Sequence, residues 1–567
     1  MGACRREIDL WKGDKLLLIS RVMDEGAHFA RRIAHNMEFL SLEPYATFVD
    51  VDAEFDWTWG DLQSHCNWVM KKLEPIEKGI ALIFLRGMRE MHSAFFGCIL
   101  SGIVPSFMPC TSKKQDPDIY WKSHRILLEH ICPVAILTTS DVHEEMLASG
   151  LNLEASEIIK FDDFEPIKTV IKPRFLGEDD TALLQHSSGT TGLKKGVALS
   201  NRSVALHAER YSVAIDCDEN DVVASWLPLY HDMGLMACLL MPAYIGMPII
   251  QMDPFEWVSR PAKFLKMIEN NKATITWMPN FSFHLYGNIA DMIEEEIDLS
   301  FVRAWINCSE VCKPVSIDSF VSGMGKFGVQ NSSVHCCYAM AETVFAASQT
   351  DLETGGLRVT CLPENLERGK RMIASEEGIS LISSGKAIDG LEIKIYDEDR
   401  SEVGEGMVGE IGISGDYLFE GYFGLDELSK SVLHDGVYFT NDLGFIYSGH
   451  VFVLGRGDDV IIVQGRNLYA HQIEAILSEI NGIKPGRNVA FGVSEEDLGS
   501  DFLVVICEKN HEVGRDEQQI KREIRSRLES EIGVLPRTVK IEEGGWLVKT
   551  SSGKISRKEN KRKFLNV

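Results

Sequence analysis

Hydroxyl, glycine and lysine side chains cluster directly after an apolar segment near residue 190. The apolar-rich segment 181–186 predicts a strand, and residues 187–196 read Ser-Ser-Gly-Thr-Thr-Gly-Leu-Lys-Lys-Gly. Glycines let a backbone approach an anion closely, hydroxyls donate hydrogen bonds, and lysine adds positive charge. The common P-loop order is absent, because the lysines precede the last glycine. We therefore predict a polyphosphate-binding loop, with a surface loop that binds nothing as the alternative.

Strands that alternate with helices must position this loop. Residues 80–85 predict a buried strand, the stretch to residue 100 predicts a helix, and 134–137 predict the next strand. The same alternation recurs over 221–305, with a short apolar strand at 273–277. Such alternation is typical of a parallel, layered α/β sheet.

The chain changes character after residue 380. Short β-like runs at 409–415 and 451–454, among many glycines, predict a small antiparallel sheet or barrel. A strand at 460–463 and a helix over 470–480 then open a compact C-terminal region of about 110 residues. The predicted fold class is α/β: a large N-terminal domain (1–457) of layered α/β subdomains with a small β-barrel-like subdomain, and a small α+β C-terminal domain (458–567).

Composition narrows the function classes. The 567 residues carry a formal net charge of -26, which argues against non-specific binding of nucleic acid. Thirteen scattered cysteines without a secretory leader are typical of reduced thiols in the cytoplasm. The most apolar stretches, 95–109 and 239–250, are short and interrupted, so we expect no transmembrane segment.

Seven motifs, in order, resemble the adenylate-forming superfamily of acyl-CoA synthetases, peptide-synthetase adenylation domains and luciferases. They are the loop 188–196, Trp-Leu-Pro-Leu-Tyr-His-Asp-Met-Gly at 226–234, Asn-Cys-Ser-Glu at 307–310, Tyr-Ala-Met-Ala-Glu at 338–342, Tyr-Phe-Thr-Asn-Asp-Leu-Gly at 438–444, Gly-Arg-Gly-Asp-Asp at 455–459 and Lys-Thr-Ser-Ser-Gly-Lys-Ile at 549–555. One motif alone is weak, but seven in this order are hard to obtain by chance. The resemblance implies activation of a carboxylic acid with ATP and Mg²⁺.

Within the superfamily, three features resemble the fatty acyl-AMP ligases. They are the segment 226–235, Gly-Arg-Asn at 465–467, and an insertion near 351–378. In that family the insertion is thought to hinder the domain rotation that admits CoA, so the acyl group passes to the phosphopantetheine arm of an acyl carrier protein. The resemblance thus implies a fatty acid substrate, an acyl carrier protein partner, and a role in lipid metabolism such as polyketide or lipopeptide biosynthesis.

Four residues depart from the family patterns. Lys194 and Ala470 stand where proline is common, and Ala339 stands where glycine is usual. Asp458 resembles the hinge of CoA ligases more than the lysine often found in fatty acyl-AMP ligases. An acyl-CoA ligase is therefore the nearest alternative, with amino-acid adenylation and a non-catalytic binding protein of the same fold as more distant ones.

The resemblance assigns nucleotide-binding roles to residues of all these motifs. Tyr338 would offer a flat face to adenine and Asp442 would accept the ribose hydroxyls, while Thr190 and Glu342 would hold Mg²⁺. The full set is Ser187, Ser188, Gly189, Thr190, Thr191, Gly192, Lys195, Ser309, Glu310, Tyr338, Ala339, Met340, Ala341, Glu342, Asp442 and Arg456.

Three residues are candidates for catalysis. Lys554 can stabilise charge on the attacking carboxylate and the α-phosphate, Lys195 neutralises phosphate charge, and His231 orients the carboxylate or packs structurally. Asp458 is the expected hinge of a mobile C-terminal domain. A solvated basic tail explains the other lysines of the last segment, Lys558, Lys561 and Lys563.

Overall fold

The computed structural model describes residues 28–50, 53–111, 117–187, 195–463, 466–495, 500–549 and 555–565. The chain divides into two compact units. The first unit comprises Met1–Trp277, Met340–Ala346 and Asp416–Lys430, and the second comprises Met278–Ala339, Ala347–Gly415 and Ser431–Val567.

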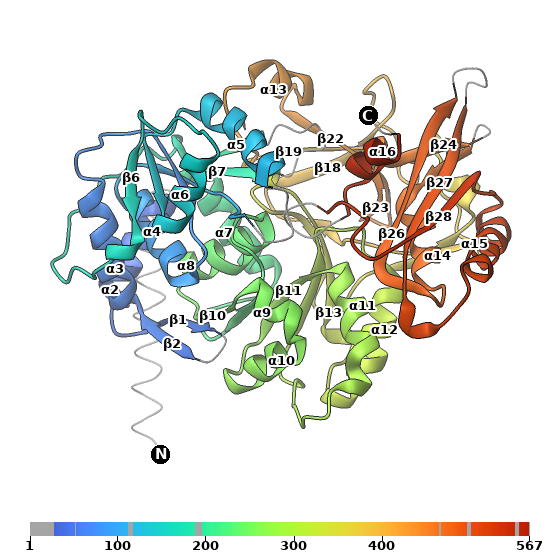
Figure 1. Cartoon of the computed structure of the whole chain (residues 1–567), viewed down its shortest axis with the longest axis horizontal. Helices are drawn as coiled ribbons and strands as arrows, with labels where there is room; N and C mark the ends of the chain where they lie inside the picture. The colour runs from blue at the N-terminus through green and yellow to red at the C-terminus, as the bar shows by residue number, and fades with distance from the viewer. Residues whose placement is uncertain are drawn as a thin grey trace. The chain divides into compact units, whose positions relative to one another are not determined.

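A parallel four-stranded sheet forms one part of the first unit (Figure 1). Its strands lie in the order β4 (Val104–Phe107), β3 (Ile80–Phe84), β5 (Ala135–Thr138) and β6 (Glu157–Lys160). Every residue of β3 is buried, which explains its uninterrupted apolar sequence. Trp121, Leu128 and Val142, from α5 (Pro117–Ile131) and α6 (Ser140–Ala148), pack against this sheet.

A second group of strands in the first unit is mainly parallel. β1 (Pro44–Val49), β10 (Ile249–Met252), β9 (Val223–Ser225) and β11 (Ile275–Pro279) run parallel, and β2 (Glu54–Thr58) pairs with β1 antiparallel. The other helices of this unit are α2 (Phe29–Phe39), α3 (Trp59–Lys72), α4 (Met88–Leu100), α7 (Asn201–Ala214), α8 (Met241–Ile245), α9 (Pro254–Ser259), α10 (Pro261–Asn270) and most of α13 (Asp426–Val432).

An antiparallel hairpin positions the glycine-rich segment of the first unit. β7 (Thr181–Ser187) pairs with β8 (Lys195–Ser200), and β20 (Gly421–Tyr422) pairs with the other side of β8. Ser187 lies opposite Lys195 at the end of the hairpin. The two ends of the predicted phosphate-binding loop are therefore held next to each other.

The second unit begins with two packed helices and two parallel strands. β12 (Ala304–Cys308) pairs with β13 (Val334–Ala339), while α11 (Asn280–Ile289) and α12 (Pro314–Met324) meet through Phe283 and Phe320, whose ring centroids are 4.8 Å apart. Strands β14 (Ala346–Gln349) and β17 (Lys386–Ala387) pair antiparallel. Parallel strands that alternate with helices are the arrangement predicted for this part of the chain.

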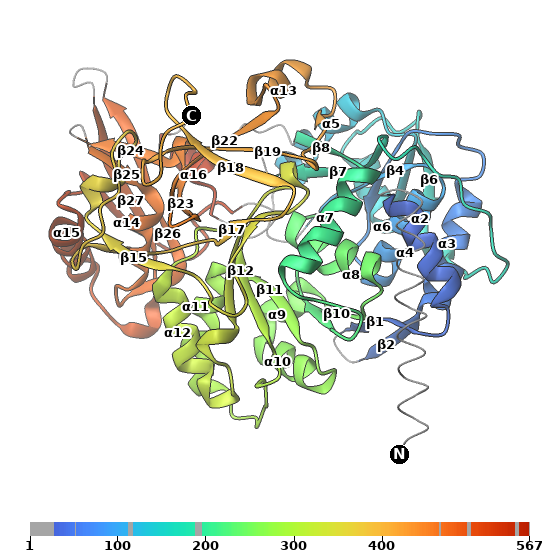
Figure 2. The ribbon, with the colours of Figure 1, turned by 180° about the vertical axis from the view of Figure 1, so that it is seen from behind.

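A five-stranded antiparallel sheet follows in the second unit (Figure 2). It contains β18 (Leu391–Tyr396), β19 (Gly409–Gly415), β22 (Val437–Tyr447), β21 (Leu433–His434) and β23 (His450–Arg456). This is the small antiparallel sheet that the segment after residue 380 predicts. Strands β15 (Arg358–Cys361) and β16 (Ile379–Ile382) pair separately; β15 lies within the predicted insertion, and β16 directly follows it.

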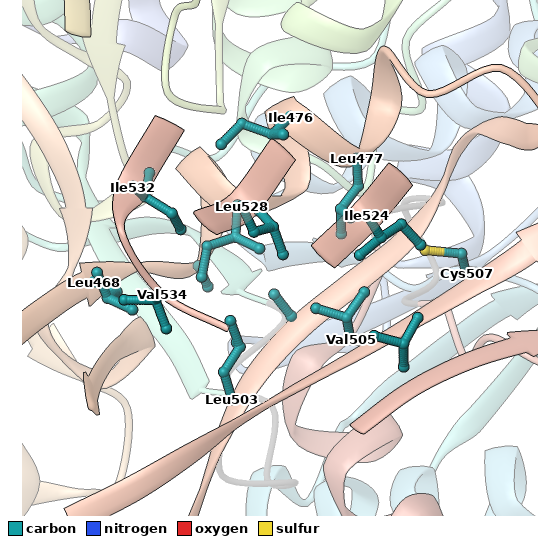
Figure 3. Packing of buried hydrophobic residues seen from close by; sticks show 14 of the residues in the cluster. Leu468, Ile476, Leu477, Leu503, Val505, Cys507, Ile524, Leu528, Ile532 and Val534 are labelled. Carbon is teal, nitrogen blue, oxygen red and sulfur yellow. The ribbon is translucent and has the colours of Figure 1, made fainter. Parts of the chain in front are cut away.

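The C-terminal region has its own apolar core (Figure 3). Leu477 of α14 (Ala470–Ser478), Leu528 of α15 (Glu517–Ile532) and Val505 of β27 (Ser500–Lys509) are fully buried together. β27 lies between β26 (Ile483–Glu495) and β28 (Thr538–Glu542). The remaining elements here are β24 (Val460–Val463), β25 (Arg466–Tyr469) and the last helix, α16 (Arg557–Leu565).

The predicted α/β fold class is confirmed, with strands and helices at the positions that the apolar runs indicate. A capping box starts helix α3: the Thr58 hydroxyl accepts from Asp61 N at 3.1 Å, and the Asp61 carboxylate accepts from Thr58 N at 2.8 Å. The domain boundary at 457/458 stays a prediction. Within the described ranges, no helix is long and apolar enough to cross a lipid bilayer.

Candidate active site

A lysine, a tyrosine and a glutamate form a polar cluster beside the β7–β8 hairpin of the first unit. Lys195 opens β8, and its Nζ lies 4.9 Å from the ring centroid of Tyr422. The Tyr422 hydroxyl donates to Oε1 of Glu342 at 2.7 Å. Phe419 N donates to the carbonyl of Glu342 at 2.9 Å, which fixes the glutamate backbone as well. The cluster thus joins a cation, a hydroxyl and a carboxylate at the base of the glycine-rich segment.

His231 is held by its neighbour in the sequence. Its Nδ1 lies 2.6 Å from Oδ1 of Asp232, and the same carboxylate oxygen accepts from Met233 N at 2.8 Å. Gln185 of β7 donates from Nε2 to the carbonyl of Tyr230 at 3.0 Å. The histidine segment is therefore tied to the strand that leads into the phosphate-loop hairpin.

Position 234 of the same segment requires glycine for a steric reason. A Cβ at this position would lie 2.4 Å from the carbonyl oxygen of Pro228, too close for any side chain. The buried π-helix Met233–Leu240 starts at this point. Such helices are rare and often lie at functional sites.

In the second unit, three of the expected nucleotide-binding residues are in contact. The Tyr338 hydroxyl donates to Oδ2 of Asp442 at 2.6 Å, and Nε of Arg456 lies 3.6 Å from Oδ1 of the same carboxylate. Asp442 and Arg456 are directly opposite each other in the β22–β23 pair. Burial, followed by the charge of Asp442, raises the pKa of Tyr338 well above its ordinary value, so this hydroxyl stays a donor.

Ser309 and Glu310 follow β12 in a turn. The Glu310 carboxylate accepts from Phe281 N at 3.1 Å, at the start of α11. This contact fixes the turn that carries both residues.

Three non-glycine residues with positive φ lie at or beside the expected site residues. They are Ser309 (φ 65°), Val344 (φ 64°), two residues after Glu342, and Asn441 (φ 60°), next to Asp442. A β-branched residue such as valine adopts this conformation only at a cost in free energy. Strained backbone of this kind is concentrated at functional sites, so each of these turns fits a functional role within its own unit.

Ser188, Gly189, Thr190, Thr191, Gly192 and Lys554 lie outside the described residues, as do the side chains of Ser187 and Asp458. Asp458 has its backbone in the 3₁₀ turn Gly457–Asp459. The short 3₁₀ turn Ala341–Thr343 carries Ala341 and Glu342, Ala339 ends β13, and Met340 N donates to the Phe345 carbonyl at 2.8 Å.

Three residues that orient the predicted site residues through their side chains, Tyr422, Gln185 and Asp232, were not themselves predicted. Tyr422 and Gln185 act on partners far away in the sequence, and an aromatic residue on a short strand looks like any core residue. Asp232 could have been found, because a carboxylate next to the candidate His231 is a common orienting partner.

The basic C-terminal segment differs from the solvated tail that its composition predicts. It forms α16, in which Nζ of Lys563 donates to the Trp546 carbonyl at 2.6 Å. Nε of Arg557 donates to the Glu474 carboxylate at 2.8 Å. These contacts require a folded partner surface, so composition alone could not show them.

Comparisons with known proteins agree with the motifs. The family model of AMP-binding enzymes matches residues 41–423. JamA, a medium-chain-fatty-acid acyl-carrier-protein ligase of Moorena producens, is 26% identical over 524 residues, which cover 88% of this chain and 87% of JamA. A Mycobacterium tuberculosis protein named as a fatty-acid–CoA ligase, fadD25, is 30% identical over 409 residues, which cover 67% of this chain and 69% of fadD25.

The fold has close structural neighbours as well. A structure from a study of fatty acyl-adenylate ligases of E. coli and L. pneumophila matches with a TM-score of 0.85 and 25% identity, covering 95% of this chain and 98% of that one. The resemblance to adenylate-forming enzymes seen in the motifs is thereby confirmed. The chain belongs to the family of AMP-binding enzymes.

Proposed function

We propose that this protein activates a fatty or related carboxylic acid as acyl-AMP and then passes the acyl group to the phosphopantetheine thiol of an acyl carrier protein. Membership of the AMP-binding family makes the chain an adenylate-forming ligase. The observation that carries the proposal is the cluster of Lys195, Tyr422 and Glu342 beside the hairpin that holds the glycine-rich segment.

The first half-reaction requires two anions to meet. A carboxylate oxygen attacks the α-phosphorus of ATP, the new C–O–P bond forms, and the bond to the β-phosphate oxygen breaks as pyrophosphate leaves. Lys195 and the loop donors Thr190 and Thr191 would neutralise the phosphates, and Lys554 would stabilise charge at the α-phosphorus. A preorganised cation outside bulk water lowers such a barrier efficiently because little reorganisation is needed.

The geometry at Glu342 fits a magnesium ion. Mg²⁺ prefers oxygen ligands and is commonly held by one or two carboxylates together with substrate phosphates. Tyr422 fixes Oε1 of Glu342 and so orients the carboxylate, whose other oxygen can act as a ligand. Glu342 and Thr190 would hold the ion, which when bound supplies positive charge to the phosphate oxygens.

His231 would orient the attacking carboxylate. Asp232 engages Nδ1 of the imidazole, which leaves Nε2 for a substrate group. In the second unit, Asp442 has acceptor oxygens suited to the ribose hydroxyls, and Tyr338 and Arg456 hold its carboxylate in place.

The choice of acceptor depends on the predicted insertion. Tyr469 of β25 is buried, and its hydroxyl donates to the carbonyl of Leu366 at 2.8 Å. Its ring packs with Val359, Cys361 and Met372 in one apolar cluster. Rotation of residues 458–567 would withdraw Tyr469 from that cluster, at a cost of about 2–3 kcal/mol in buried apolar area and about 1 kcal/mol for the hydrogen bond. A carrier protein can offset this cost through its own contacts with the enzyme, whereas free CoA offers a smaller surface, so the contact favours a carrier protein as the acceptor.

Removing this contact should allow the enzyme to use CoA as the acyl acceptor. We expect Tyr469→Ala to form acyl-CoA at least tenfold faster than the wild type, because loss of about 1.4 kcal/mol from the rotation barrier, less than half of the estimated contact free energy, already gives this factor. The measurement is acyl-CoA by mass spectrometry after incubation with ATP, Mg²⁺, a fatty acid and CoA. Tyr469→Phe, which keeps the ring and loses only the hydrogen bond, is the control for packing. No rise in acyl-CoA from a Tyr469→Ala protein that still makes acyl-AMP would contradict this role of the insertion.

An acyl-CoA ligase is the second candidate, and one observation favours it. The hinge residue is Asp458, as in CoA ligases, where fatty acyl-AMP ligases often have lysine. Family membership and the nucleotide contacts are common to both candidates, so only the acceptor separates them.

One experiment separates the two candidates. The purified protein is incubated with ATP, Mg²⁺ and a panel of carboxylic acids, with either CoA or a holo acyl carrier protein. We expect acyl-AMP and acylated carrier protein, with little acyl-CoA. Acyl-CoA formed at a comparable rate would overturn the proposed acceptor.

A further inference from the structure

A single arginine connects three elements of the second unit. Arg557 is the first residue of α16, and its Nε and Nη2 donate to the two oxygens of Glu474 on α14, at 2.8 and 2.5 Å. Its Nη1 donates to the carboxylate of Asp459, in the turn Gly457–Asp459. One guanidinium thus joins the turn at the predicted hinge to the helix that follows the predicted catalytic loop.

The partners of Arg557 are themselves fixed. Oε1 of Glu474 also accepts from Ala490 N of β26 at 3.2 Å, so the sheet sets the position of this carboxylate. The Glu474 side chain is 16% exposed and that of Arg557 is 25% exposed. A two-point contact between a planar guanidinium and a carboxylate restricts orientation more strongly than a point charge can.

The chain on both sides of residues 550–554 is anchored as well. Lys549 and Ile555 form an antiparallel bridge, and Ser556 N donates to the Val548 carbonyl at 3.0 Å. The Asn560 side chain accepts from Val548 N and donates to its carbonyl, both at 2.9 Å. Lys554 directly precedes this anchored stem in the sequence, and Arg557 is the stem residue that reaches the hinge turn.

Arg557 remains charged in this setting. Burial by itself lowers the pKa of the guanidinium, but the carboxylates of Glu474 and Asp459 outweigh it and raise the pKa. Lys313 also lies near this cluster, with its Nζ 3.3 Å from the carbonyl of His471 on α14.

We infer that Arg557 is a positioning residue for adenylate formation: by joining Glu474 to Asp459, it makes the stem of the Lys554 loop move as one body with the hinge turn. The inference rests on the proposed function. It assigns Arg557 no contact with substrate. Its effect reaches the reaction through Lys554 alone.

The test compares the two half-reactions in a variant that keeps the charge. Arg557→Lys removes the two-point contact, and we expect acyl-AMP formation to fall about tenfold. Transfer of the acyl group from supplied acyl-AMP to the holo carrier protein does not use Lys554, so it should change less than about twofold. Arg562→Lys is the matched control, because Arg562 lies on the same helix, is exposed and pairs with Glu559, three residues away, at 2.9 Å. Equal losses in both half-reactions, or no loss in either, would overturn the inference.

A double-variant comparison shows whether Arg557 acts through Lys554. In a Lys554→Ala background, Arg557→Lys should cause no further loss of acyl-AMP formation, because the group that it positions is gone. A full additional tenfold loss would contradict the inference. If Arg557→Lys does not fold, Asp459→Ala keeps the Glu474 contact and removes the contact with the hinge turn. It should slow acyl-AMP formation in the same direction, and normal rates would overturn the inference.

Failure of the inference differs from failure of the proposed function. If the wild-type protein forms no acyl-AMP, the proposed function fails and the inference falls with it. If the wild type forms acyl-AMP and Arg557→Lys does so equally fast, only the inference fails.

Discussion

Replacing Lys554 with alanine should slow acyl-AMP formation a hundredfold or more, which corresponds to about 3 kcal/mol of transition-state stabilisation. A lysine in the sequence Thr-Ser-Ser-Gly-Lys has a point charge that can reach both the attacking carboxylate and the α-phosphate oxygen. These two groups are both negatively charged and repel each other unless a cation lies between them. Loss of the lysine charge therefore raises the free-energy barrier directly. The measurement is acid-dependent exchange of labelled pyrophosphate into ATP.

The control for Lys554 is Lys561→Ala, which removes the same charge from α16. It should leave the exchange rate within about twofold of the wild type, since Lys561, which is partly exposed on α16, lies outside the motif at 549–555. Near-normal exchange by Lys554→Ala would refute the assigned role of this residue.

The second large effect is expected at the hinge. Asp458→Pro should leave acyl-AMP formation within about threefold of the wild type but reduce acyl transfer a hundredfold or more, about 3 kcal/mol. Proline fixes φ near −65° and restricts the preceding residue too, so the 3₁₀ turn Gly457–Asp459 loses the freedom that a rotation needs. Each half-reaction is measured separately, the second with supplied acyl-AMP and holo carrier protein.

A matched variant shows whether acyl transfer requires a flexible backbone at position 458 or the Asp458 carboxylate. Asp458→Ala removes the side chain but keeps the backbone free, and it should retain acyl transfer. Equal loss of both half-reactions in Asp458→Pro, or equal loss of transfer in both variants, would reject Asp458 as the hinge.

Local sequence patterns predicted much of the fold. The uninterrupted apolar run of β3 is readable because a strand covered on both faces needs no polar positions. The helix α3 starts where Thr58 and Asp61 form a capping box. Each of these signals comes from residues that are close together in the sequence. They can therefore be read without knowing which distant residues are in contact.

Contacts between distant residues could not be predicted in this way. Tyr422 meets Glu342 across 80 positions, and Arg557 meets Glu474 across 83. Nothing in the sequence near Arg557 distinguishes it from the lysines that follow it. The motif resemblance supplied the expected site residues, while the structure adds the residues that orient them.

The central claim is that this protein converts a carboxylic acid and ATP into acyl-AMP. Release of pyrophosphate by the purified protein, with Mg²⁺ and a panel of fatty and related acids, tests it most directly. We predict release that depends on the acid and is matched mole for mole by acyl-AMP when no acceptor is present. Absence of pyrophosphate with every acid in the panel would contradict the claim.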